Sequence, residues 1–110
     1  MDRTNPALAA QVDAMHPAVL RLIAEAAKGG ALHGRTVAVC GGLASDLAAA
    51  PILIGLGVTE LSAAPGVVAE LKARVRTLTL PACRDLAQRA LRQISPEAVR
   101  LLDLHTGAAP

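Results

Sequence analysis

Apolar residues recur at helical spacing in the first part of the chain, beginning at Pro17. This period is typical of an amphipathic helix, and proline suits a first-turn position, so we expect a helix over residues 17–32. Gly29 and Gly30 weaken it, because each glycine costs about 1 kcal/mol relative to alanine, and an early end of the helix is the alternative. The apolar positions are Val19, Leu20, Leu22, Ile23, Ala26 and Ala27.

Two short runs that contain β-branched residues, 36–40 and 58–62, follow glycines and indicate buried strands. Between them, Ser45 or Asp46 is suited to cap a helix that ends at a glycine within residues 55–57. A strand, a crossover helix and a second strand imply a parallel pair. Parallel sheets contain more than two strands and are covered on both faces, so we expect this sheet to have lost its neighbours.

Three further helices are indicated after the second strand. Pro65 opens the first, residues 81–94 form the second with Ile94 facing inward, and residues 96–104 form the third after the cap Ser95. The expected fold class is therefore α/β, with two parallel strands and crossover helices, followed by two C-terminal helices.

The composition is apolar for a small domain. Hydrophobic residues make up 53% of the 110, none is aromatic, 18% are charged, and the mean hydropathy is +0.43. A chain of this size buries only part of its apolar surface, so we expect some of the remainder to be covered by something else. We treat residues 1–104 as one part of a larger unit, with a disordered tail over 105–110.

Charge, hydropathy and cysteine content exclude several classes of function. The formal net charge of +2 is spread along the chain, and no aromatic residue can stack on bases, so we set nucleic-acid binding aside. The longest apolar stretch, residues 47–58, is too short to span a membrane, and the start does not resemble a signal peptide, so we expect a cytoplasmic protein without membrane contact. Cys40 and Cys83 are expected to be free thiols, with Cys83 in the core.

Four motifs carry a resemblance to a known family. They are DRxN at residues 2–5, PxVLxLI at 17–23, CGxLAxD at 40–46 and GxGxxELS at 55–62. Together they resemble the last β/α units of the phosphoenolpyruvate-binding (β/α)8 barrel in Enzyme I of the bacterial sugar phosphotransferase system. The first two motifs and their flanks are most similar to the fused multiphosphoryl transfer proteins of fructose uptake. The resemblance therefore implies the C-terminal portion of a TIM barrel.

The same resemblance implies a phosphoenolpyruvate-protein phosphotransferase. Such an enzyme transfers the phosphoryl group of phosphoenolpyruvate (PEP) to its own histidine, releases pyruvate, and phosphorylates a histidine-containing phosphocarrier protein through an N-terminal domain. Mg²⁺ is the implied cofactor of the full-length enzyme, with ligands outside this chain, and we expect no metal or other cofactor here. Because phosphoryl transfer depends on that missing machinery, we expect the chain alone to be inactive.

Two residues match the reacting and substrate-binding positions of the family. Cys40 matches the cysteine that protonates C3 of the enolpyruvate, and we expect it at the C-terminal end of a barrel strand, where such barrels place reactive groups. Arg3 matches the arginine that binds the substrate phosphate, and a planar guanidinium suits this role because its donors engage phosphate oxygens in pairs. Without the motifs, a buried thiol and a solvated arginine would be the favoured interpretations.

Three more residues are expected to support the site rather than to react. Asn5 and Asp46 suit turns and caps, and Gly41 permits close approach of the backbone. Two positions depart from the family pattern: Gly42 stands where glutamate is usual, and Ser45 stands where glycine or alanine is usual. The lost carboxylate changes the polarity around the cysteine.

A function of a different class remains open. The barrel remnant could be a non-catalytic module for oligomerisation or interaction, with Cys40 merely buried, and the lost carboxylate at Gly42 favours this alternative slightly. A strand pair with open edges is marginal by itself, so in either case we expect a homo-oligomer such as a dimer.

Overall fold

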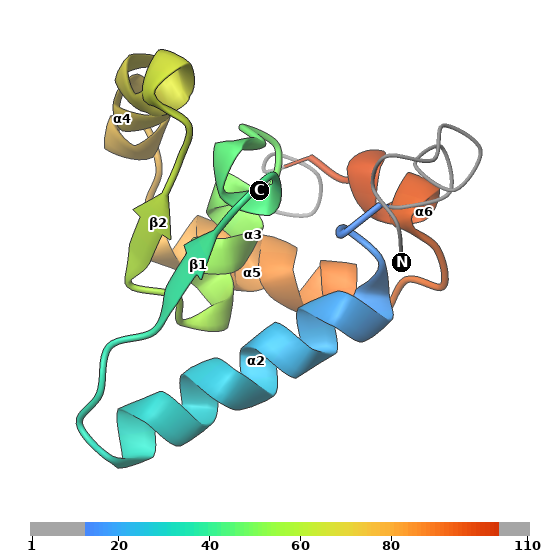
Figure 1. Cartoon of the computed structure of the whole chain (residues 1–110). Helices are drawn as coiled ribbons and strands as arrows, with labels where there is room; N and C mark the ends of the chain where they lie inside the picture. Colours follow the sequence, from blue (N-terminus) through green and yellow to red (C-terminus); the bar gives the residue numbers. More distant parts are fainter. Residues whose placement is uncertain (1–12, 104–110) are drawn as a thin grey trace, which may run out of the picture.

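The computed structural model describes residues 13–103, and a long helix leads into the rest of this region (Figure 1). Helix α2 spans Pro17–Leu32, the range that the apolar spacing predicts. Pro17 lies in its first turn, and Nδ1 of His16 accepts a hydrogen bond from the backbone N–H of Ala18 at 3.0 Å. The start of the helix is therefore set by a proline, whose missing N–H is not needed there, and by a side-chain cap.

The two glycines near the end of α2 do not interrupt the helix, so the alternative of an early end was wrong. Gly30 instead has a packing role, since a Cβ there would lie 2.6 Å from the side chain of Val37 and 3.3 Å from the carbonyl oxygen of Arg35. The carbonyl of Gly30 also accepts the N–H of Arg35 at 2.8 Å. Gly30 thus lets the chain turn back closely against the helix end.

Strands β1 (Ala38–Cys40) and β2 (Glu60–Ser62) form the predicted parallel pair. Both are shorter than predicted, because Thr59 closes the N-terminal end of the ladder. Its hydroxyl accepts the N–H of Val37 and donates to the carbonyl of Val37, each at 3.2 Å. In register, Ala38 pairs with Glu60, Val39 with Leu61 and Cys40 with Ser62.

The crossover helix α3 (Ala50–Leu56) has five of its seven residues buried. Its start differs from the prediction: the chain after β1 first forms the 3-10 turn η1 (Leu43–Ser45), and Asp46 ends this turn rather than capping α3. Its end follows the prediction, because Gly57 adopts a left-handed conformation with φ of +104°. The N–H groups of residues 57 and 58 then bond back to carbonyls of the last turn, each at 3.1 Å.

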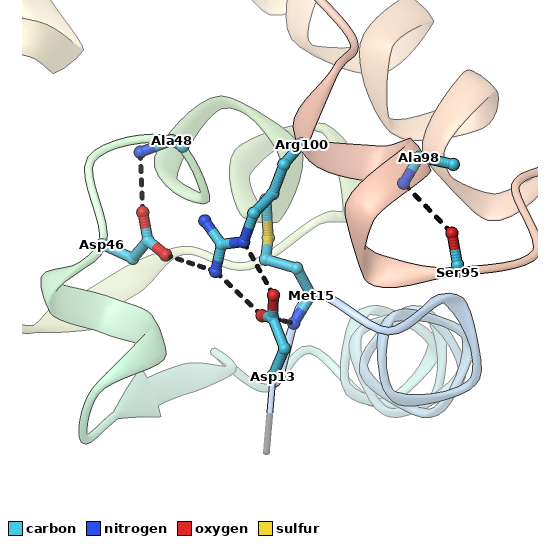
Figure 2. A network of polar contacts seen from close by, with 7 residues as sticks. All are labelled: Asp13, Met15, Asp46, Ala48, Ser95, Ala98 and Arg100. Carbon is cyan, nitrogen blue, oxygen red and sulfur yellow. Dashed lines mark hydrogen bonds and ion pairs between the residues drawn. The ribbon is translucent and has the colours of Figure 1, made fainter. Parts of the chain in front are cut away.

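The helices after β2 begin near the predicted points but differ in extent. Ser95 caps the last one as predicted, since its hydroxyl accepts the N–H of Ala98 at 3.1 Å (Figure 2). The prediction that Ile94 faces inward was wrong, because α5 ends before it and Ile94 is 91% exposed. The predicted tail over 105–110 lies outside the described residues. The elements are η2 (Pro65–Val67), α4 (Val68–Arg76), α5 (Leu80–Leu91) and α6 (Pro96–Arg100).

The core lies where α3 and α5 meet the start of α2 and the end of the described chain. α3 and α5 approach so closely that a Cβ at Gly55 would overlap the backbone carbonyl of Cys83 and lie 2.8 Å from the Cβ of Ala87. The predicted place of Cys83 in the core is confirmed, since this residue is 0% exposed. The largest fully buried side chains include Met15, Leu20, Ile52, Leu53 and Val99.

One face of the strand pair is covered and the other is exposed. Val39 and Leu61 are half-buried against the core, on the side of α3 and α5, which lie behind the strands in Figure 1. Because side chains alternate along a strand, their neighbours point to the opposite face. The described chain is therefore an α/β structure with two parallel strands and helices, consistent with part of a barrel. The exposed face carries Ala38, Cys40, Glu60 and Ser62.

We predict that Gly55→Ala lowers the free energy of unfolding by about 2 kcal/mol or more, because the added methyl group must displace the backbone of α5. Urea unfolding followed by circular dichroism measures this change. Gly29→Ala is the matched control: its Cβ would meet nothing within 4 Å, and alanine favours a helix by up to about 1 kcal/mol. Equal stability of Gly55→Ala and the wild type would contradict the close packing.

Candidate functional site

Cys40 is the last residue of β1, and its side chain is exposed. The next residue, Gly41, has φ of +83°, a left-handed conformation that other residues disfavour, and it turns the chain away from the strand. The predicted position of the cysteine, at the C-terminal end of a strand before a glycine turn, is confirmed. The alternative of a buried Cys40 was wrong for the described chain, and the thiol is accessible to a bound molecule.

The loop after β2 is tied to the loop that follows Cys40. Since β2 ends at Ser62, which pairs with Cys40, both strands end at the same edge. The hydroxyl of Ser45 accepts a hydrogen bond from the backbone N–H of Ala64 at 2.8 Å. Glycine or alanine, which the resemblance leads us to expect at position 45, has no side-chain acceptor for this bond. Ser45 therefore adds a link between the two loops.

Asp46 lies just after η1, and both of its carboxylate oxygens are engaged (Figure 2). Oδ1 accepts the backbone N–H of Ala48 at 3.0 Å, and Oδ2 accepts a hydrogen bond from Nη2 of Arg100 at 2.9 Å. The first bond is a local turn of the kind expected for aspartate. The second links the loop behind Cys40 to α6, near the C-terminal end of the described chain.

Arg100 also binds Asp13, through Nε to Oδ2 and Nη2 to Oδ1, each at 2.8 Å. This hydrogen bonding holds the pKa of Asp13 below its usual value; partial burial opposes the effect, while the N–H of Met15 and the charge of Arg100 add to it. The pair therefore stabilises the fold above the ordinary carboxyl pKa, and this contribution is lost as the pH falls through the lowered pKa of Asp13. Hydrogen bonding to Asp13, and then to Asp46, raises the pKa of Arg100 above its usual range.

Gly42 is not required by packing or by the backbone. A Cβ at Gly42 would meet no atom within 4 Å, and its φ of −61° is open to any residue. Its carbonyl accepts the N–H of Ser45 at 3.1 Å, inside the η1 turn. The fold therefore does not demand a glycine at this position, and a side chain such as the glutamate that the resemblance leads us to expect has room there.

Part of the predicted site falls in the described region. Sequence reasoning missed the contacts of Arg100, because its partners Asp13 and Asp46 are 87 and 54 positions away, and no local motif marks such a contact. The predicted residues inside the region are Cys40, Gly41 and Asp46, on one stretch of chain, and those outside it are Arg3 and Asn5.

Residues 13–103 contain neither a cluster of metal-binding side chains nor a helix that could span a membrane. No group of three or more His, Cys, Asp or Glu side chains in this region could hold a metal ion. The carboxylates of Asp13 and Asp46 face a guanidinium, which occupies the place that a cation would take. These residues therefore do not fit a Mg²⁺ site by themselves. In the same region, no helix combines the length and hydropathy needed to cross a membrane.

An apolar groove of about 540 Å³ lies between α3, β2 and α4. Its lining includes Leu61 and Leu71, with Lys72 and Arg76 on the α4 side. Leu61 points to the covered face of the strand pair, whereas Cys40 is on the exposed face. The groove is thus separate from the surface that presents the thiol.

The chain matches the family described as PEP-utilising enzyme, PEP-binding domain, over residues 1–80. The chain belongs to this family. A multiphosphoryl transfer protein of Xanthomonas campestris pv. campestris is 48% identical over 94% of the chain, and one of Rhodobacter capsulatus is 45% identical over 91%. A phosphoenolpyruvate-protein phosphotransferase of Mycoplasma genitalium is 37% identical over 92% of the chain. The family resemblance carried by the four motifs is confirmed.

The chain spans a small part of these PEP-utilising relatives: 12% of the length of the first two and 18% of the third. The family match includes all five predicted site residues and Asp13, and it ends before most of α5 and all of α6. The contact between Asp46 and Arg100 therefore joins the matched region to a part of the chain beyond it.

We predict that iodoacetamide modifies Cys40 at least about tenfold faster than Cys83. Cys40 is exposed, whereas Cys83 is buried, and burial raises the pKa of the Cys83 thiol and so disfavours the reactive thiolate. Alkylation of the native chain, followed by mass mapping of the two cysteine peptides, measures both rates. In urea the two thiols should react at similar rates, which serves as the control. Faster modification of Cys83 in the native chain would show that the placement is wrong.

Proposed function

We propose that this chain forms the end of the PEP-binding barrel of a phosphoenolpyruvate-protein phosphotransferase, in which Cys40 is the general acid. The observation that carries the proposal is the exposed thiol at the C-terminal end of β1, the edge where parallel barrels place reacting groups. The family match, and a relative named as a phosphoenolpyruvate-protein phosphotransferase, support this reaction class.

In the proposed reaction, the bond between phosphorus and the enol oxygen of PEP breaks as phosphorus bonds to a histidine nitrogen elsewhere in the longer protein. The enolate left behind takes a proton at C3 from the thiol of Cys40, which gives pyruvate and a thiolate that solvent reprotonates. Arg3 would bind the phosphate of PEP through paired donors. The phosphohistidine then phosphorylates a histidine-containing phosphocarrier protein, and the reaction takes place in the cytoplasm.

The Mg²⁺ of such an enzyme is proposed to be held by residues outside this chain, as the family resemblance implies. The phosphorylated histidine is proposed to lie in another domain of the longer protein. On this proposal, the chain contributes substrate binding and proton delivery, and the remaining parts contribute phosphoryl transfer.

We predict that Cys40→Ala slows pyruvate formation by the full-length parent about 100-fold, within the range for loss of a general acid. A lactate-dehydrogenase-coupled assay with Mg²⁺ and the phosphocarrier protein measures this rate. Cys83→Ala is the matched control, because that thiol is buried away from the strand edge, and its turnover should stay near that of the parent. The 110-residue chain alone should give no pyruvate above its own Cys40→Ala variant. An unimpaired Cys40→Ala parent would refute the proposed role.

The second candidate function, association with further copies, is favoured by the uncovered face and open edges of the strand pair. The uncovered face itself carries small and polar side chains, so the driving force would come from the open strand edges and from apolar side chains exposed elsewhere, whose removal from water contributes about 25 cal/mol per Å². Large apolar side chains are also exposed elsewhere on the described chain: Leu22, Leu32, Leu80, Ile94 and Leu101.

We predict that the isolated chain forms a dimer or a small oligomer at micromolar concentration, because the strand pair can complete its sheet only with another molecule. Size exclusion with light scattering measures the mass. A folded monomer near 11.2 kDa that persists on dilution would show that the exposed face is stable in water.

A further inference from the structure

Arg100 binds two aspartates that lie far from it, and far from each other, along the chain (Figure 2). Asp13 precedes α2, Asp46 follows η1 in the loop behind Cys40, and Arg100 is the last residue of α6. One guanidinium therefore joins three segments of the fold. We call the side chains of Asp13, Asp46 and Arg100 the arginine clamp.

Each carboxylate of the arginine clamp is oriented by its own backbone. Oδ1 of Asp13 accepts the N–H of Met15 at 3.0 Å, and Oδ1 of Asp46 accepts the N–H of Ala48 at 3.0 Å. These local bonds limit how each carboxylate can turn toward the guanidinium. Because the donors of arginine are fixed in a planar fork, the arginine clamp defines the relative position of the two aspartates.

Asp13 and Arg100 of the arginine clamp lie close in sequence to buried core residues. Val99, beside Arg100, is 1% exposed, and Met15, two positions after Asp13, is 0% exposed, and both belong to the same buried cluster. The start of α6 is also held, since Ser95 caps it. Arg100 is thus presented from a short helix whose position is set by buried side chains.

The arginine clamp also constrains the turn that follows Cys40, because Asp46 is hydrogen-bonded within that turn. The N–H of Asp46 bonds to the carbonyl of Leu43 at 3.2 Å, and the N–H of Ser45 bonds to the carbonyl of Gly42 at 3.1 Å. These bonds make residues 42–46 one compact turn that begins two positions after the cysteine. Fixing Asp46 therefore fixes the far end of the turn that Cys40 enters.

The side chains of the arginine clamp are partly exposed, at 40% for Arg100, 28% for Asp13 and 26% for Asp46. Ion pairs with such exposure contribute little net stability, so their effect is chiefly geometric. Both carboxylates bind the same nitrogen, Nη2, at 2.8 and 2.9 Å. Without the guanidinium, two negative groups would face each other and repel, which would push the two segments apart.

We propose that Arg100 is a positioning residue that holds the loop behind Cys40 in a fixed relation to Asp13, just before α2. The inference rests on the proposed function, in which Cys40 delivers a proton to C3 of PEP. A general acid must keep its position relative to the reacting carbon closely, because small displacements reduce the rate strongly.

The test compares Arg100→Gln, Arg100→Lys and the double variant Arg100→Gln/Asp46→Asn in the full chain. Amide exchange at Ala48, followed by NMR, reports on the loop, and the alkylation rate of Cys40 reports on the thiol beside it. Alkylation of Cys83 reports on unfolding of the whole chain. Arg92→Gln is the matched control, since Arg92 is an exposed arginine just after α5.

We expect Arg100→Gln to speed exchange at Ala48 about tenfold and to change the Cys40 rate about threefold or more, while Cys83 stays protected. Arg100→Lys should give rates between those of the wild type and Arg100→Gln, because one ammonium group cannot reproduce the planar fork of guanidinium donors. The double variant should recover part of the lost protection at Ala48, since it removes the repulsion between Asp13 and Asp46. If Arg100 only stabilised the fold, the double variant would exchange as fast as Arg100→Gln. The proposal would be overturned if amide exchange at Ala48 in Arg100→Gln stayed within twofold of the rate in Arg92→Gln. It would also be overturned if the changes at Ala48 and Cys40 were matched by faster alkylation of Cys83.

The same variants in the full-length parent separate this inference from the proposed function. Arg100→Gln should lower kcat/KM for PEP about tenfold, with part of the loss recovered in Arg100→Lys. If Cys40→Ala leaves turnover intact, the proposed function fails, and the exchange data still decide whether Arg100 holds the loop. If the loop loosens but kcat/KM is unchanged while Cys40→Ala is impaired, the positioning role fails.

Discussion

The fold depends on how closely α3 and α5 approach each other. The absence of a side chain at Gly55 allows the carbonyl of Cys83 and the methyl group of Ala87 to lie directly against α3. A chain without aromatic residues has no large ring to fill space between helices, so dense packing requires short distances between backbones. The strand pair, the start of α2 and α6 are all placed against this helix pair.

The exposure of Cys40 follows from this packing. Val39 is half-buried against the core, and its neighbours along β1 point to the other face. A shift of β1 by one residue would exchange the two faces and turn Cys40 inward. The packing of Val39 against α3 and α5 thus determines the direction in which the Cys40 side chain points. The links made by Ser45 and Asp46 then hold the loop that follows.

The sequence was sufficient wherever a local pattern carried the information. The apolar period from Pro17 gave the limits of α2, and the glycine beside Cys40 marked the end of β1. It was insufficient where a residue had competing partners: Asp46 fits a helix cap, but Arg100 and a nearby N–H take both of its oxygens. Such a contact between distant residues has no local signature. The roles of all five predicted site residues stay predictions, and for Arg3 and Asn5 the position does too, because both lie outside the described residues.

The arginine clamp can form only after all three of its residues have left the ribosome. A ribosome releases the chain from its N-terminus, so Asp13, Cys40 and Asp46 emerge before Arg100. Until α6 leaves the exit tunnel, the two aspartates have no common counter-charge, and a nascent chain can form the strand pair before Arg100 joins the three segments. The geometry around Cys40 is therefore completed only after the core helices have emerged and α6 has followed them.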